Sequence, residues 1–515
     1  MITSKPTGRP QGKLGELEVR LRTPVPHRLG VGRASALFVH GAALSPTGLP
    51  ADVELVVNGR GRRALADQMP SPGLAAELGE ARGSGSSRAI FWGFVPLGPG
   101  PTRLAVSATL PGGDRHRVEL GTVEPRPPAG PAEAGVAIDP ARTVAICMAT
   151  HDPPPELFRR QVESLLAQTH RDWICLISDD ASGPEGLATL RDAVAADPRF
   201  VVSRSSRRLG AYENFHRALE MVPADVAHVA LSDQDDRWYP DKLEALIAGL
   251  GDANLVFSDM RVTRPDGAIL ADTYWSRRLP NHGNFASLLL GNSVTGAASL
   301  FRRRLLDDVL PFPPRVGNLY HDHWIALVAG ALGSIAYLPR PLYDYVQHPD
   351  AALGHGGANR GVVGGGPVRR LLALRGGAPG RLRSSWRRSY FADYCRLICC
   401  ATVLEARFRE RAGRRERRAL ALALRGDGSP LTAAWLAGRQ VRRLWRDETL
   451  GSEAALLRAF AWRAGLRLRR GRVADPYDDA DLPAGIVDPV EALDGDRTQE
   501  RSPDPSIPGP GLQAP

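Results

Sequence analysis

The feature that most constrains the fold of this chain is a regular alternation of short apolar segments with amphipathic segments. The apolar segments include residues 144–148, 174–177 and 226–231. In the segments between them, residues such as Phe158, Val162 and Leu165 recur at helical spacing. Such alternation predicts an α/β fold with a parallel, doubly wound sheet. Ligands bind these sheets at the carboxyl ends of the strands, so functional side chains are expected there.

The preceding part of the chain has a different pattern. Residues 14–125 contain short β-rich runs separated by turn signals such as Asn58-Gly59. We expect a small all-β, sandwich-like domain here, after a flexible N-terminus of residues 1–13. Trp92 and Phe94 could line a sugar-binding face, but core packing is the favoured interpretation. A Pro/Ala/Gly linker of residues 126–140 then leads into the α/β domain, expected over residues 141–365.

Charge is unevenly distributed along the 515 residues, which carry 66 Lys+Arg and 56 Asp+Glu. Residues 366–474 contain 26 arginines against 8 acids, whereas residues 475–515 contain 2 against 10. We expect an arginine-rich helical region followed by an acidic disordered tail. Two interpretations of the helical region stay open: a solvated subdomain packed on the rest, or attachment to an anionic membrane surface. It lacks interleaved aromatics and known nucleic-acid modules, so nucleic acid is not expected as a partner.

Cysteine usage and hydropathy bear on the compartment. The five cysteines show no CxxC spacing, and Cys147 and Cys175 lie within apolar runs. Unpaired core thiols are typical of a reducing compartment. The N-terminus lacks the apolar stretch of a signal peptide, and no run of 18 apolar residues occurs. A cytoplasmic protein is therefore expected, with peripheral contact at the inner face of the plasma membrane as an open possibility.

Acidic residues gather where two predicted strands end. The strand at residues 174–177 leads into Asp179 and Asp180, and the strand at 226–231 leads into Asp233, Asp235 and Asp236. Three carboxylates within four residues repel one another. A divalent cation, Mg²⁺ or Mn²⁺, compensates such repulsion and often bridges substrate phosphates. Helix capping would explain one aspartate at each place, but not three together.

Two later residues are candidates for chemistry. Asp322 opens an apolar helical stretch, where it could be a helix N-cap or a general base. His348 follows a strand-like segment and could be a ligand to metal or diphosphate, or a structural histidine. The glycine-rich residues 354–366 that follow are expected to form a mobile loop over a site.

The order of these motifs resembles the family-2 glycosyltransferases of GT-A fold, particularly their bacterial rhamnosyltransferase-like branch. The resemblance covers about residues 141–356 and is carried by residues 148–152, 179–182, 210–215, 232–243, 295–297, 321–322 and 347–348. The acidic string beginning at Asp233 is the most specific of these. Ala181 departs from the family pattern, which usually has glycine there, and His321 stands where the family usually has glutamate.

The resemblance implies a role for each matching position. The residues implied in donor binding are Thr150, Asp152, Asp179, Asp180 and Asp233. Asp233 and Asp235 would form the metal-binding DxD pair, with His348 as a further ligand to metal or diphosphate. Asp322 would be the catalytic base. His151 and Asp152 also differ from the family pattern, so the nucleotide stays open.

The predicted function is an inverting, metal-dependent transfer of a sugar from a nucleotide-diphosphate donor. Rhamnose is one candidate sugar. The acceptor would be a hydroxyl of a cell-surface polysaccharide or of a lipid-linked glycan. The alternative is a non-catalytic glycan-binding or polysaccharide-assembly protein with a relic transferase domain. The presence of Asp233, Asp235 and Asp322 favours the enzyme.

Overall fold

The computed structural model describes residues 11–14, 17–22, 24–69, 88–126, 137–195, 197–275, 279–348, 386–442 and 451–468. The predicted glycine-rich loop at 354–366 and the acidic tail at 475–515 lie outside the described residues. So do most of the predicted linker and of the N-terminal segment.

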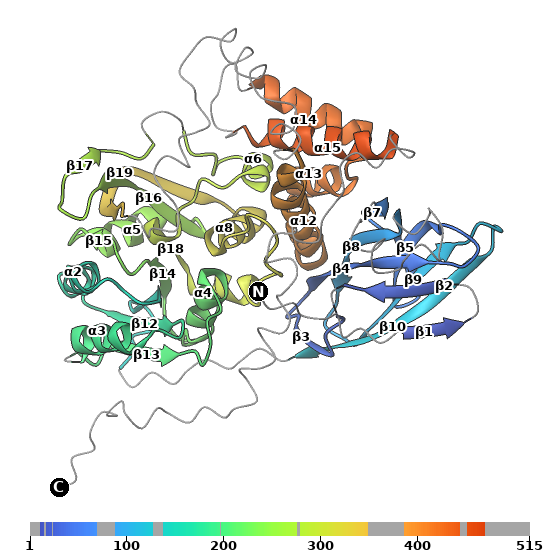
Figure 1. The fold of residues 1–515 in the computed structure, drawn as a ribbon. Helices are drawn as coiled ribbons and strands as arrows, with labels where there is room; N and C mark the ends of the chain where they lie inside the picture. Colours follow the sequence, from blue (N-terminus) through green and yellow to red (C-terminus); the bar gives the residue numbers. More distant parts are fainter. Residues whose placement is uncertain are drawn as a thin grey trace.

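The N-terminal domain is a β-sandwich of two five-stranded sheets (Figure 1). One sheet has the order β1 (Gln11–Leu14), β2 (Leu17–Leu21), β4 (Ser35–Leu44), β8 (Ile90–Leu97), β7 (Ala66–Met69). The other has the order β3 (Arg28–Gly30), β10 (Arg115–Arg126), β9 (Thr102–Thr109), β5 (Ala51–Val57), β6 (Arg60–Arg63). Inward-facing residues of both sheets, such as Leu37, Val53 and Val106, form a core of their own. The predicted all-β fold of this region is confirmed.

Strand β4 shows why the sandwich does not stand alone. All ten of its residues are buried. Leu37 and Val39 face the sandwich core, whereas Ala36 and Phe38 belong to the larger core shared with the rest of the protein. Trp92 on β8 has no exposed surface, and its ring lies 5.5 Å from that of Phe391. The interpretation of Trp92 as a core residue is therefore confirmed.

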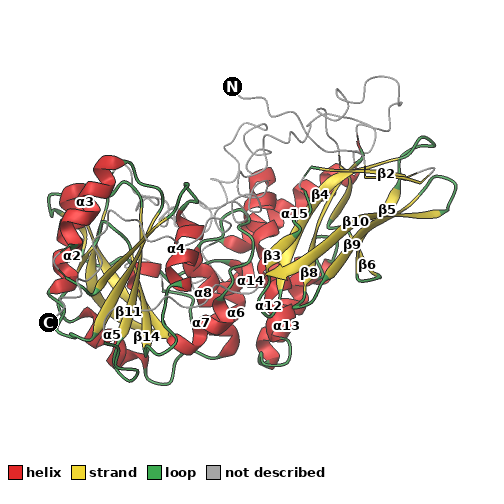
Figure 2. Ribbon diagram, turned by 90° about the horizontal axis from the view of Figure 1, so that it is seen from below, coloured by secondary structure: helices red, strands yellow, loops and turns green. Residues whose placement is uncertain are grey.

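The α/β domain is built on a nine-stranded mixed sheet (Figure 2). The sheet has the order β13 (Phe200–Arg204), β12 (Trp173–Asp179), β11 (Val144–Thr150), β14 (His228–Ser232), β18 (Ser299–Arg302), β16 (Leu255–Thr263), β19 (Ile335–Val346), β15 (Arg237–Trp238), with β17 (Ile269–Ala271) paired to β16. Its helices are α2 (Pro155–Leu166), α3 (Pro184–Val194), α4 (Ala211–Glu220), α5 (Lys242–Leu250), α6 (Phe285–Leu290), α7 (Leu306–Val309) and α8 (His321–Leu332). The predicted α/β fold class is confirmed.

The four strands from β13 to β14 are parallel, as predicted, but β18 runs antiparallel to both of its neighbours. The chain enters β18 from the short turn η3 (Gly296–Ala298), so that turn lies at the same sheet edge as the carboxyl end of β14. In the parallel part, Thr150 pairs with Asp179 and Met148 with Ser232. The loops after β11, β12 and β14 therefore begin side by side.

The described parts of the arginine-rich region, residues 386–442 and 451–468, are mainly helical, as predicted. They comprise the π-helical turn η5 (Tyr390–Tyr394), α12 (Cys395–Phe408), α13 (Arg414–Leu424), α14 (Pro430–Arg442) and α15 (Ser452–Leu468). Helix α12 lies between the two other domains and contacts β4, β8 and α8 (Figure 1). Within the described ranges, no helix is long and apolar enough to cross a membrane. The five cysteines are all buried and free.

Arg407 of α12 is an arginine of this region that does not face solvent. This side chain is buried, and its guanidinium donates hydrogen bonds to the carbonyls of Ala34, Asp308, Val309 and Pro311. One arginine thereby joins the β-sandwich to the segment that precedes α8. A buried guanidinium needs several acceptors to offset its desolvation, and backbone carbonyls from two domains supply them here.

Candidate active site

Asp179, at the end of β12, organises the first part of the site. It is completely buried, and its carboxylate accepts hydrogen bonds from the hydroxyls of Thr150 and Ser182. The backbone N–H of Ser182 donates to its other oxygen at 3.0 Å. Arg204 Nε lies 3.6 Å from the same oxygen. Thr150 and Asp179 are therefore brought together as predicted, in a network that fixes the loop after β12.

Asp180 and Asp152 differ in how much of their carboxylate remains free. Asp180 is buried and accepts the backbone N–H groups of Leu209 and Gly210 at 2.6 and 2.8 Å, which anchors the loop before α4. These bonds give Asp180 a structural role. Asp152 accepts the N–H of Gly183 at 2.7 Å, but 55% of its side chain stays exposed. Of the two, only Asp152 is open to a ligand.

The loop after β12 turns through a residue with a positive φ angle. Ala181 has φ +57°, in the left-handed region that disfavours residues with a Cβ atom. Asp152, on the facing loop, also has a positive φ of +39°. Both loops at this edge of the sheet therefore carry backbone strain, which often accumulates at functional sites.

Gln234 joins the two neighbouring loops. Its Oε1 accepts the backbone N–H of His151 at 2.8 Å, and its Nε2 donates to the His151 carbonyl at 3.2 Å. Asn214 on α4 acts similarly, donating to the carbonyls of Thr150 and Ser178. Both residues lie within the motifs that carry the resemblance, but nothing in the sequence separates these roles from direct ligand contact.

Lys242 lies beneath the acidic loop after β14. It is completely buried, and its ammonium donates to the carbonyl of Ala297. The same nitrogen lies 3.7 Å from the ring centre of Trp238 and 4.2 Å from that of Tyr343. Burial lowers the pKa of Lys242, against the opposing effect of the nearby carboxylates. This role of Lys242 is not visible in the sequence, because only tertiary packing shows that a lysine is buried.

The carboxylates of the acidic cluster repel one another, and the nearby charge of Lys242 offsets this repulsion only in part. Burial raises the pKa of Asp233 to about 7, and the charges of Asp235 and Asp322 add to that rise. Burial likewise raises the pKa of Asp236, whose Oδ2 is buried without a hydrogen-bond partner. Asp233 therefore lies close enough to Asp235 and Asp322 for their charges to act on it. A bound cation would relieve the repulsion among them, so the residues present fit a divalent metal.

His348 reaches this cluster from the end of β19. Its Nε2 lies 2.8 Å from Oδ2 of Asp235, and its side chain is 8% exposed. Across the described part of the chain, no three His, Cys, Asp or Glu side chains converge as a complete metal cage. The donor set is instead typical of Mg²⁺ or Mn²⁺ sites that use one or two carboxylates and leave other positions to substrate phosphates.

Asp322 lies in the first turn of α8, beside the acidic cluster. Its Oδ1 accepts the backbone N–H of His323 at 2.6 Å, and the N–H of Gly296 also donates to the carboxylate. Burial raises the pKa of Asp322 to about 7, although these hydrogen bonds oppose the rise. A Cβ on Gly296 would lie 2.8 Å from Nε2 of His321, so only glycine permits this close approach.

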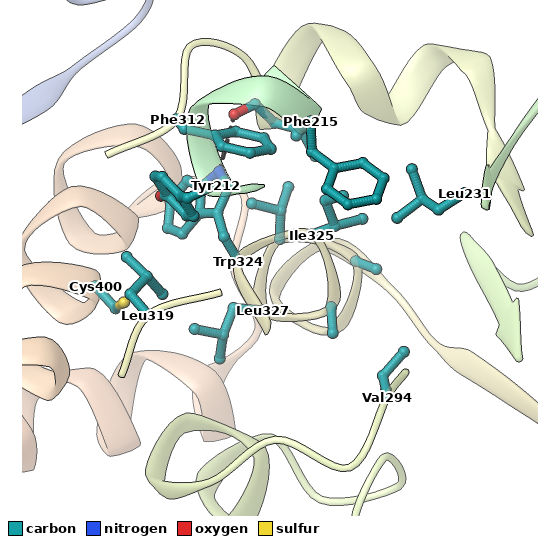
Figure 3. Close-up of a cluster of buried hydrophobic side chains, with 14 of the residues drawn as sticks. Tyr212, Phe215, Leu231, Val294, Phe312, Leu319, Trp324, Ile325, Leu327 and Cys400 are labelled. Atoms are coloured by element: carbon teal, nitrogen blue, oxygen red, sulfur yellow. Dashed lines mark hydrogen bonds between the residues drawn. The ribbon is translucent and has the colours of Figure 1, made fainter. Parts of the chain in front are cut away.

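An apolar cluster packs against α8. Figure 3 shows Trp324 and Ile325 of this helix among Tyr212, Phe215 and Phe312. The ring of His321 stacks on Phe215, with centroids 3.7 Å apart. Burial lowers the pKa of His321 to about 3, so this imidazole is neutral. The glutamate usual in the family is thus replaced by an uncharged ring that packs against α4.

Comparison with known proteins agrees with this geometry. Residues 145–310 match the family described as Glycosyl transferase family 2. A glycosyltransferase of Methanocaldococcus jannaschii, itself uncharacterized, is 24% identical over 194 residues, which are 36% of this chain and 64% of that protein. One from Nostoc is 26% identical over 197 residues, or 37% of this chain and 60% of that protein. An uncharacterized protein of Sinorhizobium fredii is 29% identical over 120 residues, or 22% of this chain and 13% of that protein.

The chain spans less than two thirds of the length of each of these relatives. Among solved structures, S. aureus TarS 1–349 with UDP-GlcNAc gives a TM-score of 0.36 at 13% identity, covering 65% of this chain and 93% of that one. A mannosyltransferase of Pyrobaculum calidifontis, solved with GDP-Man and Mn²⁺, gives a TM-score of 0.32 at 20% identity. The match covers 67% of this chain and 91% of that one.

The family match spans the strands β11, β12 and β14, whose ends carry Thr150, Asp179 and Asp233. The motifs of the resemblance and the geometry of the site agree with it. This chain therefore carries a glycosyltransferase domain of family 2.

Proposed function

We propose that this protein is an inverting, metal-dependent glycosyltransferase. It transfers a sugar from a nucleotide-diphosphate donor to a hydroxyl of a cell-surface polysaccharide or a lipid-linked glycan. Rhamnose is the first donor sugar to test. The observation that carries the proposal is the position of Asp322, a half-buried carboxylate beside Asp233 and Asp235 at the edge where the parallel strands end.

Asp322 acts as the base. Its Oδ1 is held by the backbone N–H of His323, which fixes the orientation of the carboxylate. A base whose pKa lies near the working pH is effective in proton transfer, which contributes about 10²–10⁴-fold to a rate. The acceptor oxygen loses its proton to Asp322 and bonds to the anomeric carbon. The bond from that carbon to the diphosphate oxygen breaks, and single displacement inverts the centre.

Asp235 is proposed as the direct ligand to the cation, with Asp233 beside it and His348 as ligand or orienting partner. Hard Mg²⁺ or Mn²⁺ prefers such oxygen donors. A bound cation would stabilise the charge that develops on the departing diphosphate. Breaking the contact between His348 and Asp235 would free a lone pair on Oδ2 of Asp235 for the cation. Nε2 of His348, which donates in this contact, would offer a lone pair only after its proton has moved to Nδ1 or been lost.

The nucleotide is proposed to lie over the ends of β11 and β12. Asp152 keeps an exposed carboxylate for it, and Thr150 and Asp179 hold the loop in place. Asp180, although expected to bind the donor, supports the site by anchoring the next loop.

The helical region is proposed to bring the enzyme to an anionic membrane from the cytoplasmic side. The arginines of α13 that face solvent are Arg414, Arg415, Arg417 and Arg418. Each basic residue near an anionic surface contributes about 1 kcal/mol. A lipid-linked acceptor would lie at that surface. Co-sedimentation with vesicles containing anionic lipid tests this part, and no binding above that to neutral vesicles would contradict it.

A panel of nucleotide sugars, offered with Mg²⁺ or Mn²⁺ and assayed for donor turnover, tests the main proposal. We expect one donor to be consumed, only with a divalent cation. NMR of the product should show an inverted anomeric configuration. A protein that consumes no donor yet binds glycan would instead support the non-catalytic alternative.

A further inference from the structure

We infer that Arg396, in the helical region outside the family match, is a positioning residue that holds the proposed base Asp322 in place. The inference rests on the proposed function, because it assigns Asp322 its role. It gives helix α12 a part in catalysis, because Arg396 would act through the residues that it contacts, Leu290 and His323.

Arg396 lies in the first turn of α12 and is 3% exposed. Its Nη2 donates to the carbonyl of Leu290, the last residue of α6, at 2.7 Å. Its Nη1 lies 3.2 Å from Nδ1 of His323, in the first turn of α8. One guanidinium therefore joins the end of α6 to the beginning of α8.

These contacts fix the protonation of His323. A guanidinium can only donate hydrogen bonds, so Nδ1 of His323 must be the acceptor. The proton of the neutral ring is then on Nε2, which donates to the carbonyl of Leu288 at 2.8 Å. Burial, followed by the charge of Arg396, lowers the pKa of His323 to about 3. The ring is thus held at both nitrogens, once by α6 and once by α12.

Two backbone N–H groups donate to Asp322, and one of them belongs to a residue that Arg396 contacts. One donor is the backbone N–H of His323 itself. The other is the N–H of Gly296, which follows α6 along the chain after its C-cap at Gly291. Arg396 contacts His323, which supplies the first donor, and it contacts the end of α6, from which the chain runs on to Gly296 in η3. Loosening these contacts would change the orientation of the carboxylate.

The helical region contacts the approach to α8 at a second place. The backbone N–H of Asn318 donates to the carbonyl of Ala392 in η5 at 3.2 Å. Gly317 has φ +55°, and a Cβ there would lie 2.3 Å from the same carbonyl oxygen. The π-helical turn η5 directly precedes α12, and such turns often occur at functional sites. Helix α8 is thus held at its first turn and just before it.

The test compares Arg396→Met and Arg396→Lys with the matched control Arg463→Met in the full-length protein. Arg463 is 2% exposed and lies 3.8 Å from Asp427 and 3.9 Å from Asp67, so it interacts with groups other than α8. Steady-state kinetics with the preferred donor give kcat and KM, corrected for the folded fraction measured by circular dichroism.

We expect Arg396→Met to lower kcat about 10–100-fold, because misplacing a catalytic group by 1 Å can cost about 10²-fold. The donor KM should stay within about threefold, since the donor loops do not touch Arg396. Arg396→Lys should give an intermediate kcat, because an ammonium can make only part of the guanidinium's contacts. Arg463→Met should keep kcat within about threefold of wild type.

Equal values of kcat for the folded Arg396→Met and Arg463→Met variants would overturn the inference. If Arg396→Met does not fold, the kcat of Arg396→Lys is compared with that of wild type instead. A wild-type kcat for Arg396→Lys would also overturn the inference. Failure of the proposed function looks different. In that case the wild-type protein itself would transfer no sugar from any donor.

Discussion

His348 and Asp235 are 113 residues apart in the sequence, yet Nε2 of the imidazole lies 2.8 Å from Oδ2 of the carboxylate. The contact joins the end of β19 to the acidic loop after β14. It places an imidazole nitrogen against the residue proposed to hold the metal, in a pair that is largely buried.

Substitution of Asp235 by Asn should weaken donor binding in the presence of Mn²⁺ at least about tenfold, because the cation loses a charged oxygen ligand. Chelation by EDTA should weaken binding to wild type in the same way. Isothermal titration calorimetry measures both effects. Asp241→Asn is the control, because Asp241 is a half-exposed acid paired with Arg340. Equal donor affinity with and without divalent cation would contradict the assignment.

Ala181→Gly should stabilise the protein, by up to about 1 kcal/mol. Glycine removes the strain at φ +57°, which costs about 1–2 kcal/mol for a residue with a Cβ, while adding some entropy to the unfolded chain. The control is Ala195→Gly, at a position with φ −58° where glycine relieves nothing and should destabilise. Denaturant unfolding measures both. A destabilised Ala181→Gly protein would mean that the strain is absent.

Trp92→Ala should destabilise the protein by about 3–5 kcal/mol, as is typical when a large buried side chain is deleted. Its ring is buried between the β-sandwich and the helical region, against Tyr390 and Phe391. Leu431→Ala, at a side chain that is 56% exposed, should change stability by no more than about 0.5 kcal/mol. Equal unfolding midpoints for the two variants would contradict the packing role.

The pH dependence of kcat follows from the pKa of Asp322, which burial raises to about 7. A base must be deprotonated to accept a proton, so kcat should rise as the pH increases through about 7 and then level off. Below that value it should fall about tenfold per pH unit. Assays between pH 5.5 and 8.5 measure this. A flat profile over the range would exclude a base of raised pKa.

The sequence predicts those parts of the site that depend on strand order. Once residues 144–148, 174–177 and 226–231 are recognised as parallel strands, Thr150, Asp179 and Asp233 must meet at one edge. Which side chains are buried, and which groups they form hydrogen bonds with, does not follow from such patterns. The resemblance implies that Asp180 binds the donor, and the sequence does not show that its carboxylate also accepts two backbone N–H groups of another loop.

The arginines of the helical region show more clearly that a sequence pattern does not reveal which side chains are buried. In the sequence, Arg396 and Arg407 are indistinguishable from the exposed arginines of α13, because all of them occur in basic helical segments. Their acceptors lie in other domains, at Leu290 and Ala34, so only the packed structure separates them. The sequence of β18, a strand of four residues, also does not reveal that it runs antiparallel to its neighbours, because its direction depends on where the chain enters the sheet.

The measurement that tests the account most directly is a comparison of Asp322→Asn with wild type, recording kcat for sugar transfer and Kd for the donor with Mn²⁺. Asparagine keeps the shape of the side chain but cannot accept the proton. The account predicts that kcat falls about 10²–10⁴-fold while the donor Kd stays within about threefold. Transfer at a near-normal rate by Asp322→Asn would contradict it.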